Sequence, residues 1–203
     1  MRVKYQRAPI TTEWTVGAKA NTGDGILAAE KLGAALELME DSWWGGPTVP
    51  LVDAPWFALS ERNSPGSIIV NLKAQRFMNE SMPYVEACHH MYGGQYGQGS
   101  GPGENVPAWL IFDQQYRDRY IFAGLQPGQR IPKKWLESGV VVKADTLAEL
   151  AEKTGLSGEA LAATVERFNG FARTGVDEDF HRGESAYDRY YGGSDQQAQS
   201  EPG

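Results

Sequence analysis

The sequence predicts a mixed α+β domain, and two observations carry that prediction. Apolar residues recur at helical spacing in the last third of the chain, whereas short β-branched runs such as SIIVN at 67–71 and WLIFD at 109–113 are typical of strands. A chain of 203 residues with 41% hydrophobic composition is long enough to bury a core. The length allows one large domain or two small ones, and no internal repeat is visible.

The first 65 residues are predicted to hold one helix. Residues 1–23 read as irregular because a proline and the TT and NTG clusters interrupt any period. Apolar residues then recur at helical spacing over 24–40, where Thr22 or Asp24 can cap the helix start. Residues 43–65 are rich in Trp, Gly and Pro, which is typical of a loop.

The middle of the chain is predicted to form a hairpin, a helix and a loop. Residues 76–78 could pair with the strand at 67–71. A helix over 81–91 would carry Pro83 in its first turn and end at the glycines that follow. Residues 93–107 are rich in Gly and Pro, so we expect a mobile loop there.

Two further strands are predicted, at 109–113 and at 140–143 (VVVK), with a short helix over 133–137 between them. Thr146 then opens a helix. Because Glu149 stands three residues on, it can reach back to the cap amide and complete a capping box.

The last predicted helix follows Ser157 and stops near Gly175. Its apolar face carries Leu161, Val165, Phe168 and Phe171. Residues 192–203 (GGSDQQAQSEPG) have almost no apolar content, so we expect a disordered tail.

Composition excludes several classes of function. A net charge of −7 with no cluster of Lys or Arg argues against nucleic acid as a partner. The single cysteine, Cys88, excludes an intrachain disulfide and is expected to be a buried apolar residue. There is no apolar run of transmembrane length and no signal peptide, so we expect a cytoplasmic protein without a transmembrane segment.

Motifs of common active sites are missing from the sequence. It contains no GxGxxG, Walker or GxSxG motif, and His89 and His90 point in different directions on a helix, so no metal site is expected. The TGDG run at 22–25 places backbone amides and an Asp at a helix start. These groups could form hydrogen bonds with a ribose or a pyrophosphate, or with the helix itself. Tyr84, in RFMNESMPY, is by itself one of nine tyrosines.

Three segments together resemble the flavoprotein superfamily of fumarate reductases and ketosteroid dehydrogenases. They are ANTGDGILAAEKLGAAL at 20–36, PGSIIVNLKAQRFMNES at 65–81 and GVDEDFHRGESAYDRYY at 175–191, with VVVKADTLAELAEKTGL between the last two. Their order follows that of the family from Lys4 to about Tyr191. The resemblance therefore covers nearly the whole chain.

One position indicates the branch of this superfamily. In the dicarboxylate reductases an Arg that supplies the proton stands five residues after the Asn of the RFxNE motif, and counted from Asn79 that position is Tyr84. A dicarboxylate site also needs several cations, whereas the neighbours here are Met82, Pro83 and Val85. The pattern NESMPY instead resembles the 3-ketosteroid Δ1-dehydrogenases, in which this tyrosine is a catalytic base.

The resemblance implies FAD as cofactor and a 3-ketosteroid as substrate. Tyr84 would take a C2 proton of the steroid A ring while a hydride leaves C1 for the flavin. A tyrosine, with an ordinary pKa of about 10, would need a nearby hydroxyl or positive potential for this. Walls of Trp, Tyr, Phe and Met would suit a flat apolar substrate. The residues expected to contact FAD are Asn21, Thr22, Gly23 and Asp24.

The resemblance also divides the chain. Residues 1–42 would be a remnant of the FAD-binding domain, 43–191 the substrate-binding cap domain of a two-domain flavoprotein, and 192–203 a tail. The flavin-domain segments that flank this part in the family are missing, so we expect the chain alone to hold no FAD and to be inactive. Alternatives are another FAD-dependent oxidoreductase, such as a 5α-steroid Δ4-dehydrogenase or a fumarate reductase-like enzyme, and a non-catalytic steroid-binding module.

Overall fold

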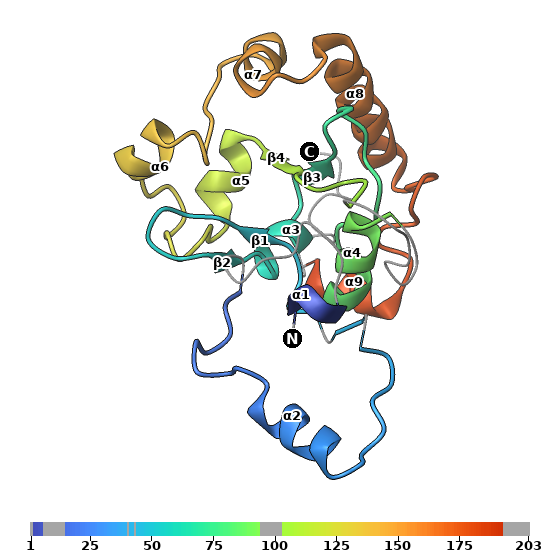
Figure 1. The fold of residues 1–203 in the computed structure, drawn as a ribbon. Helices are drawn as coiled ribbons and strands as arrows, with labels where there is room; N and C mark the ends of the chain where they lie inside the picture. The colour runs from blue at the N-terminus through green and yellow to red at the C-terminus, as the bar shows by residue number, and fades with distance from the viewer. Residues whose placement is uncertain (1, 6–14, 40, 43, 94–102, 193–203) are drawn as a thin grey trace.

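The computed structural model describes residues 2–5, 15–39, 41–42, 44–93 and 103–192. These residues form short helices and two antiparallel two-stranded sheets, which confirms a mixed α/β fold (Figure 1). The helices are α1 (Arg2–Tyr5), α2 (Asp24–Lys31), α3 (Ser60–Asn63), α4 (Tyr84–Met91), α5 (Gln114–Arg119), α6 (Lys133–Glu137), α7 (Leu147–Thr154), α8 (Gly158–Thr174) and α9 (Ala186–Tyr191). The strands are β1 (Thr48–Val49), β2 (Trp56–Phe57), β3 (Ser67–Val70) and β4 (Trp109–Phe112).

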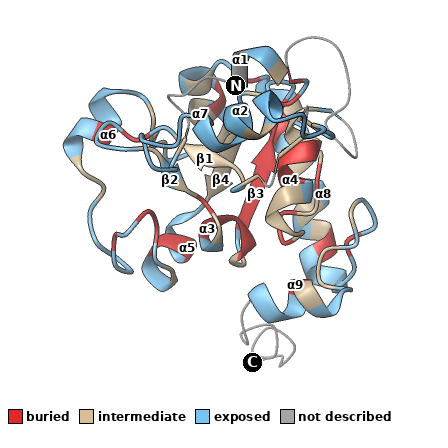
Figure 2. Ribbon diagram, turned by 60° about the horizontal axis from the view of Figure 1, so that its bottom comes forward, coloured by how far each residue is buried: buried red, intermediate tan, exposed pale blue. Residues whose placement is uncertain are grey.

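The central sheet pairs β3 with β4, with Val70 opposite Trp109. Successive side chains of a strand point to opposite faces, and helices lie on both faces here. Ile68 and Val70 pack on α7 and α8, whereas Ile69 packs with Met78 and with α4. All four residues of β3 are therefore buried, as the red strand in Figure 2 shows.

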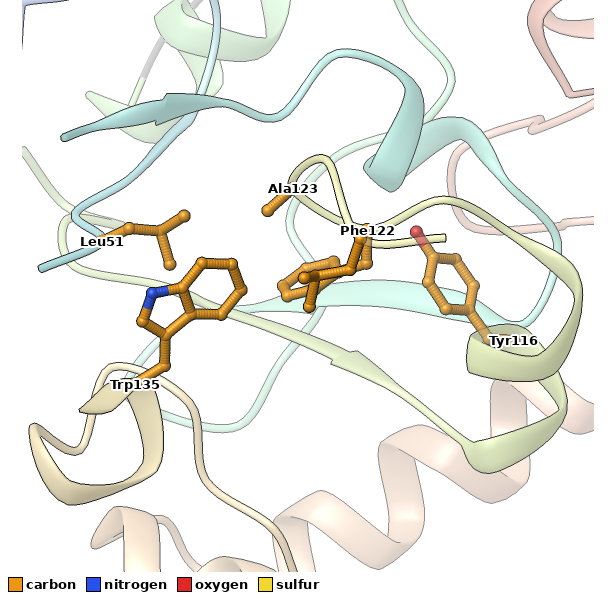
Figure 3. Packing of buried hydrophobic residues seen from close by; sticks show 6 residues of the cluster. Leu51, Tyr116, Phe122, Ala123 and Trp135 are labelled. Atoms are coloured by element: carbon orange, nitrogen blue, oxygen red, sulfur yellow. The ribbon is translucent and has the colours of Figure 1, made fainter. Parts of the chain in front are cut away.

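A third apolar cluster joins several loops to the face of β4 that carries Leu110 and Phe112. Phe122 and Trp135 meet edge to face with ring centroids 6.5 Å apart, and Leu51, Tyr116 and Ala123 pack around them (Figure 3). The Tyr116 hydroxyl donates a hydrogen bond of 2.8 Å to a carbonyl of α3. The cluster thereby ties the segment around β1 and β2 to α3, α5 and α6.

Helices α7 and α8 confirm the predictions from capping residues. The Oγ atoms of Thr146 and Ser157 each accept an amide N–H of the first turn, at 3.1 and 3.3 Å, and left-handed glycines end both helices. Glu149 differs in one detail. Its carboxylate accepts the N–H of Asp145 at 2.9 Å, one residue before the cap amide that we expected.

The predicted strand at 140–143 is wrong. This segment is irregular, and the N–H of Val141 donates to the carbonyl of Trp135 at 3.1 Å. Val140 and Val141 pack partly buried against the cluster of Trp135. Side-chain packing rather than strand pairing therefore accounts for the β-branched run.

The predicted hairpin partner of β3 is confirmed for one residue pair only. Residues 76–78 contribute one isolated bridge, between Arg76 and Val70, and the full partner is β4. The N–H of Ile69 instead donates to the carboxylate of Glu80 at 3.1 Å.

Several helix boundaries differ from the predictions. α2 ends at Lys31 instead of residue 40, because the chain turns through Gly33 at φ +87°. α4 begins at Tyr84 instead of Ser81. α1 lies where residues 1–23 were expected to be irregular, and β1, β2 and α3 lie within the predicted loop 43–65.

Two predictions fall largely outside the described residues. Of the predicted loop 93–107, residues 94–102 are not described. Asn105 lies in the described part of this loop, where it is buried and its side-chain amide donates to the carbonyl of His90 at 2.9 Å. Of the predicted tail, Gly192 is the residue after α9 and residues 193–203 are not described.

Candidate active site around Tyr84

Tyr84 is the first residue of α4 and follows a tight turn. The side-chain oxygen of Asn79 accepts the N–H of Ser81 at 2.8 Å, and its amide nitrogen donates to Asp188 of α9 at 2.9 Å. Pro83 then stands at the N-cap with an extended backbone, φ −50° and ψ 144°. The hydrogen bonds of Asn79 and the extended backbone of Pro83 therefore fix the position of Tyr84 at the start of α4.

The half-buried side chain of Tyr84 lies against aromatic and backbone groups of other segments. Its ring meets Phe57 of β2 edge to face, with centroids 6.0 Å apart. Gly46 packs closely against Phe57 and Tyr84, because a Cβ added to it would strike the Phe57 ring and lie 3.2 Å from the Cβ of Tyr84. Tyr187 of α9 interacts electrostatically with Tyr84. A second phenol therefore lies near Tyr84.

Arg62 of α3 is a buried cation in the same region, and the sequence analysis missed it. Its side chain is fully buried, its Nη1 donates to the carbonyl of Glu80, and its Nε and Nη2 find no hydrogen-bond partner in the described residues. Its charge interacts with Tyr187 and Cys88. No local pattern could have identified it, because Arg62 sits in a short helix within the predicted loop 43–65.

Cys88 lies one helical turn after Tyr84 and is buried, as expected. Burial raises the pKa of its thiol to about 12, against smaller lowering effects of a hydrogen bond with the Gly46 backbone and of the Arg62 charge. The thiol stays protonated at neutral pH, so Cys88 is not a nucleophile.

Two hollows border α4. The larger has a volume of about 2040 Å³ and a mainly apolar lining that includes Trp44, Met91 and Tyr92. It exceeds the range of about 300–1,000 Å³ that small-molecule pockets occupy, so a steroid alone would not fill it. The smaller, of about 550 Å³, is open and lies beside Asn79 and Pro83.

The residues expected to contact FAD lie at the start of α2, apart from α4 (Figure 1). Asn21, Thr22 and Asp24 are exposed, and Gly23 takes a left-handed conformation at the N-cap, where no side chain caps the helix. Exposed amides, a hydroxyl and a carboxylate at an open helix start are donors and acceptors that a ribose or pyrophosphate can use. These residues therefore fit a flavin nucleotide, although the structure does not bring them to Tyr84.

Two of the three histidines contact nearby carboxylates. His89 Nε2 lies 3.0 Å from Asp41 Oδ1, and His181 Nδ1 lies 3.0 Å from Glu184 Oε1. Across the part of the chain that the structure describes, no three His, Cys, Asp or Glu side chains gather as metal ligands would. Nor does any helix of that part have the length and apolar character needed to cross a membrane.

Comparison with known proteins relates nearly the whole chain to flavoproteins. The model of the family described as FAD binding domain matches residues 2–199. The sequence is 88% identical over 192 residues to the 3-oxosteroid 1-dehydrogenase of Mycolicibacterium smegmatis and 82% identical over 192 residues to that of Mycobacterium tuberculosis, covering 95% of this chain and 34% of each relative. The chain thus spans about a third of the length of these relatives.

The fold is similar to a solved structure of the same kind. That structure is the 3-ketosteroid Δ1-dehydrogenase of Sterolibacterium denitrificans in complex with 1,4-androstadiene-3,17-dione. The TM-score is 0.84 at 40% sequence identity, and the match covers 95% of this chain and 34% of that one. Sequence and fold therefore agree on the relationship.

Proposed function

Since the chain belongs to the FAD-binding family of flavoproteins, we propose that it is the substrate-facing part of a 3-ketosteroid Δ1-dehydrogenase. Such an enzyme introduces a double bond between C1 and C2 of the steroid A ring. The observation that carries the proposal is the sequence identity to the mycobacterial 3-oxosteroid 1-dehydrogenases, which extends over 192 residues. The full reaction belongs to the whole enzyme, of which this chain supplies one part.

Burial along the chain supports the domain boundaries of the proposal. Residues 1–42 are the portion of the FAD-binding domain, and α2 within them has no buried residue. Residues 43–191 are the substrate-binding cap, and the three apolar clusters draw all their residues from this part. Residues 192–203 are assigned to neither part. The family model spans both main parts, which fits a cap inserted in a flavin domain.

Tyr84 is the base of the proposed reaction. The 3-keto group acidifies the C2 hydrogens of the substrate, and the Tyr84 oxygen accepts one of these protons. FAD supplies the acceptor for the hydride that leaves C1. The Phe57 ring and the Gly46 backbone contact the tyrosine side chain and limit its movement, and aromatic rings of this kind suit contact with a flat apolar steroid.

Asn21, Thr22, Gly23 and Asp24 are the residues of this chain that contact FAD in the proposal. The open N-terminus of α2 offers amide donors for a pyrophosphate, and the neighbouring side chains can bind a ribose hydroxyl.

The test is Tyr84→Phe in a full-length enzyme that carries this sequence. With the 1,2-dihydro form of 1,4-androstadiene-3,17-dione as substrate, we expect turnover to fall by about 10³-fold or more, because the proton acceptor is lost. FAD should stay bound, as its absorption spectrum reports. Tyr190→Phe is the matched control, since Tyr190 is 80% exposed, and its turnover should be unchanged. Ordinary turnover in Tyr84→Phe would show that another group is the base.

A further inference from the structure

The carboxylate of Asp41 connects its own segment of chain to α4. Its Oδ1 accepts the backbone N–H of Ser42 at 2.7 Å and the indole N–H of Trp44 at 2.8 Å. The Nε2 atom of His89, which belongs to α4, lies 3.0 Å from the same oxygen. Two of these donors are close neighbours in the sequence, whereas His89 is 48 residues away. Asp41 therefore does more than stabilise a local turn.

The charge of Asp41 suits this role. Partial burial raises the pKa of its carboxyl, but the hydrogen bonds from His89, Ser42 and Trp44 lower that pKa overall. The carboxylate is thus ionised at neutral pH and can only accept, so Nε2 of His89 carries the proton. Hydrogen bonds to an ionised acceptor are stronger than neutral ones, and His89 is buried, where such a bond is little weakened by water.

The segment that Asp41 holds lies along one side of α4. Tyr84, Cys88 and Tyr92 are spaced four residues apart, so they share this side of the helix. Trp44 packs on Tyr92 with ring centroids 5.6 Å apart. The Gly46 backbone forms a hydrogen bond with Cys88, and a Cβ added to Gly46 would lie 3.2 Å from the Cβ of Tyr84. These contacts extend from the C-cap of α4 to its first residue, which is Tyr84.

We propose that Asp41 is a positioning residue, whose hydrogen bonds hold Trp44 and Gly46 against α4 and thereby fix the Tyr84 side chain. The inference rests on the proposed function for its catalytic meaning. Asp41 and Gly46 also lie on opposite sides of the proposed boundary between residues 1–42 and 43–191, so Asp41 couples the flavin-binding portion to the helix that carries the base. Such coupling matters because a misplacement of about 1 Å can cost on the order of 100-fold in rate.

The first experiment compares Asp41→Ala with Asp41→Asn in the 203-residue chain. Alanine removes the acceptor, whereas the Oδ1 of asparagine can accept the same donors. The Asp41 side chain is 36% exposed, which leaves room for the amide group. The chain is labelled at the indole nitrogens and at the tyrosine rings for NMR, and Trp44→Phe and Tyr84→Phe assign the two signals.

We expect Asp41→Ala to change both signals. Hydrogen exchange of the Trp44 indole N–H should become about tenfold faster or more, because a hydrogen bond to a charged group is lost. The Tyr84 ring signal should move as well, because the Gly46 contact loosens. Asp41→Asn should leave both signals close to those of the parent.

Asp53→Ala is the matched control. Asp53 also accepts a side-chain donor, from Lys134 at 2.5 Å, but it lies between β1 and β2 and both side chains are exposed. Its substitution should leave the Trp44 and Tyr84 signals unchanged. Asp41→Ser, whose shorter side chain cannot reach all three donors, serves if Asp41→Ala does not fold. An unchanged Tyr84 signal in folded Asp41→Ala or Asp41→Ser would overturn the inference, whatever happens at Trp44.

The full-length enzyme provides the second readout, with rates expressed per bound FAD. Asp41→Ala should lower kcat by about 10- to 100-fold and change KM by less than about threefold, and Asp41→Asn should restore kcat to within about threefold of the parent. An unchanged kcat in Asp41→Ala, or equal losses in both variants, would contradict the inference. If the NMR changes are found while the full-length enzyme does not turn over steroids, the proposed function fails and the structural coupling through Asp41 stands.

Discussion

Gly46 brings the backbone of the 43–65 segment against Tyr84, and its own conformation leaves no room for a side chain. It adopts φ +98°, where a Cβ would strike the Phe57 ring and lie 3.2 Å from the Cβ of Tyr84. We expect Gly46→Ala to lower the free energy of unfolding by about 3 kcal/mol, from backbone strain of about 1–2 kcal/mol and overpacking of about 1–3 kcal/mol.

Gly128→Ala separates these two causes. Gly128 also has a positive φ, +70°, but an added Cβ would meet nothing within 4 Å. Its substitution by alanine should therefore lower the free energy of unfolding by the backbone strain alone, about 1–2 kcal/mol. Urea unfolding of both variants measures the two losses. Equal losses in the two variants would show that Gly46 does not shape the Tyr84 contact.

Residues of the site differ in how far the sequence could reveal them. Tyr84 could be proposed from the sequence because a local motif, NESMPY, carries it. Arg62, Gly46 and Phe57 were not, because they come from a segment whose Trp, Gly and Pro content indicates a loop. Their role depends on tertiary contacts with α4 and α9, which no local periodicity encodes.

At the scale of elements, a buried ionic cluster of Arg76, Glu80 and Asp177 connects the segment between α8 and α9 to the segment after β3. Arg76 pairs with Glu80 and with Asp177 at 2.8 Å each, and both carboxylates are nearly or fully buried. We expect Asp177→Asn to lower the free energy of unfolding by about 3 kcal/mol at pH 7, because it leaves Arg76 with one partner fewer. Asp179→Asn, which breaks an exposed pair with Arg167, should cost less than about 1 kcal/mol.

The same pair predicts an acid dependence. Burial alone would raise the pKa of Asp177, but the hydrogen bond and charge of Arg76 lower it overall, below 3.8. A lowered folded-state pKa contributes stability that is complete above the unfolded pKa, and that is lost as the pH falls through the folded one. The difference between parent and Asp177→Asn should therefore be constant at neutral pH and shrink below about pH 4 in denaturation series. A difference that grew on acidification would contradict this assignment.

Elements with local stop and start signals were predictable, and those that depend on distant partners were not. Thr146, Ser157 and Gly175 mark the ends of α7 and α8 in the sequence itself. The run at 140–143 has strand composition, yet its valines pack on Trp135 and its backbone finds no strand in the described residues. Likewise β3 pairs with β4 far along the chain, where the local hairpin rule would have placed 76–78.

At the scale of the whole molecule, the apolar clusters and the candidate FAD contacts lie in different parts of the chain. The clusters belong to 43–191, whereas α2 exposes Ile26 and Leu27, each at 40%, and Leu32 beyond it at 89%. An exposed ion pair of 3.8 Å, from Lys4 to Glu30, links α2 to α1. Neighbouring apolar side chains so exposed are typical of a surface that another protein segment covers.

We therefore expect the 203-residue chain by itself to release FAD. Tight dinucleotide binding in open α/β flavin domains uses a glycine-rich turn directly after a strand to cradle the pyrophosphate, whereas the GDGILA run at 23–28 opens α2 with no strand over the described residues 15–22. Asn21–Asp24 offer hydrogen bonds from an exposed loop, which must be ordered at an entropic cost when the ligand binds. Mixing the chain with excess FAD, desalting it and recording the flavin spectrum measures retention. The full-length Mycolicibacterium smegmatis relative, treated in the same way, is the comparison. A yellow protein with one FAD per chain would mean that the loop around α2 holds the cofactor without the rest of the flavin domain.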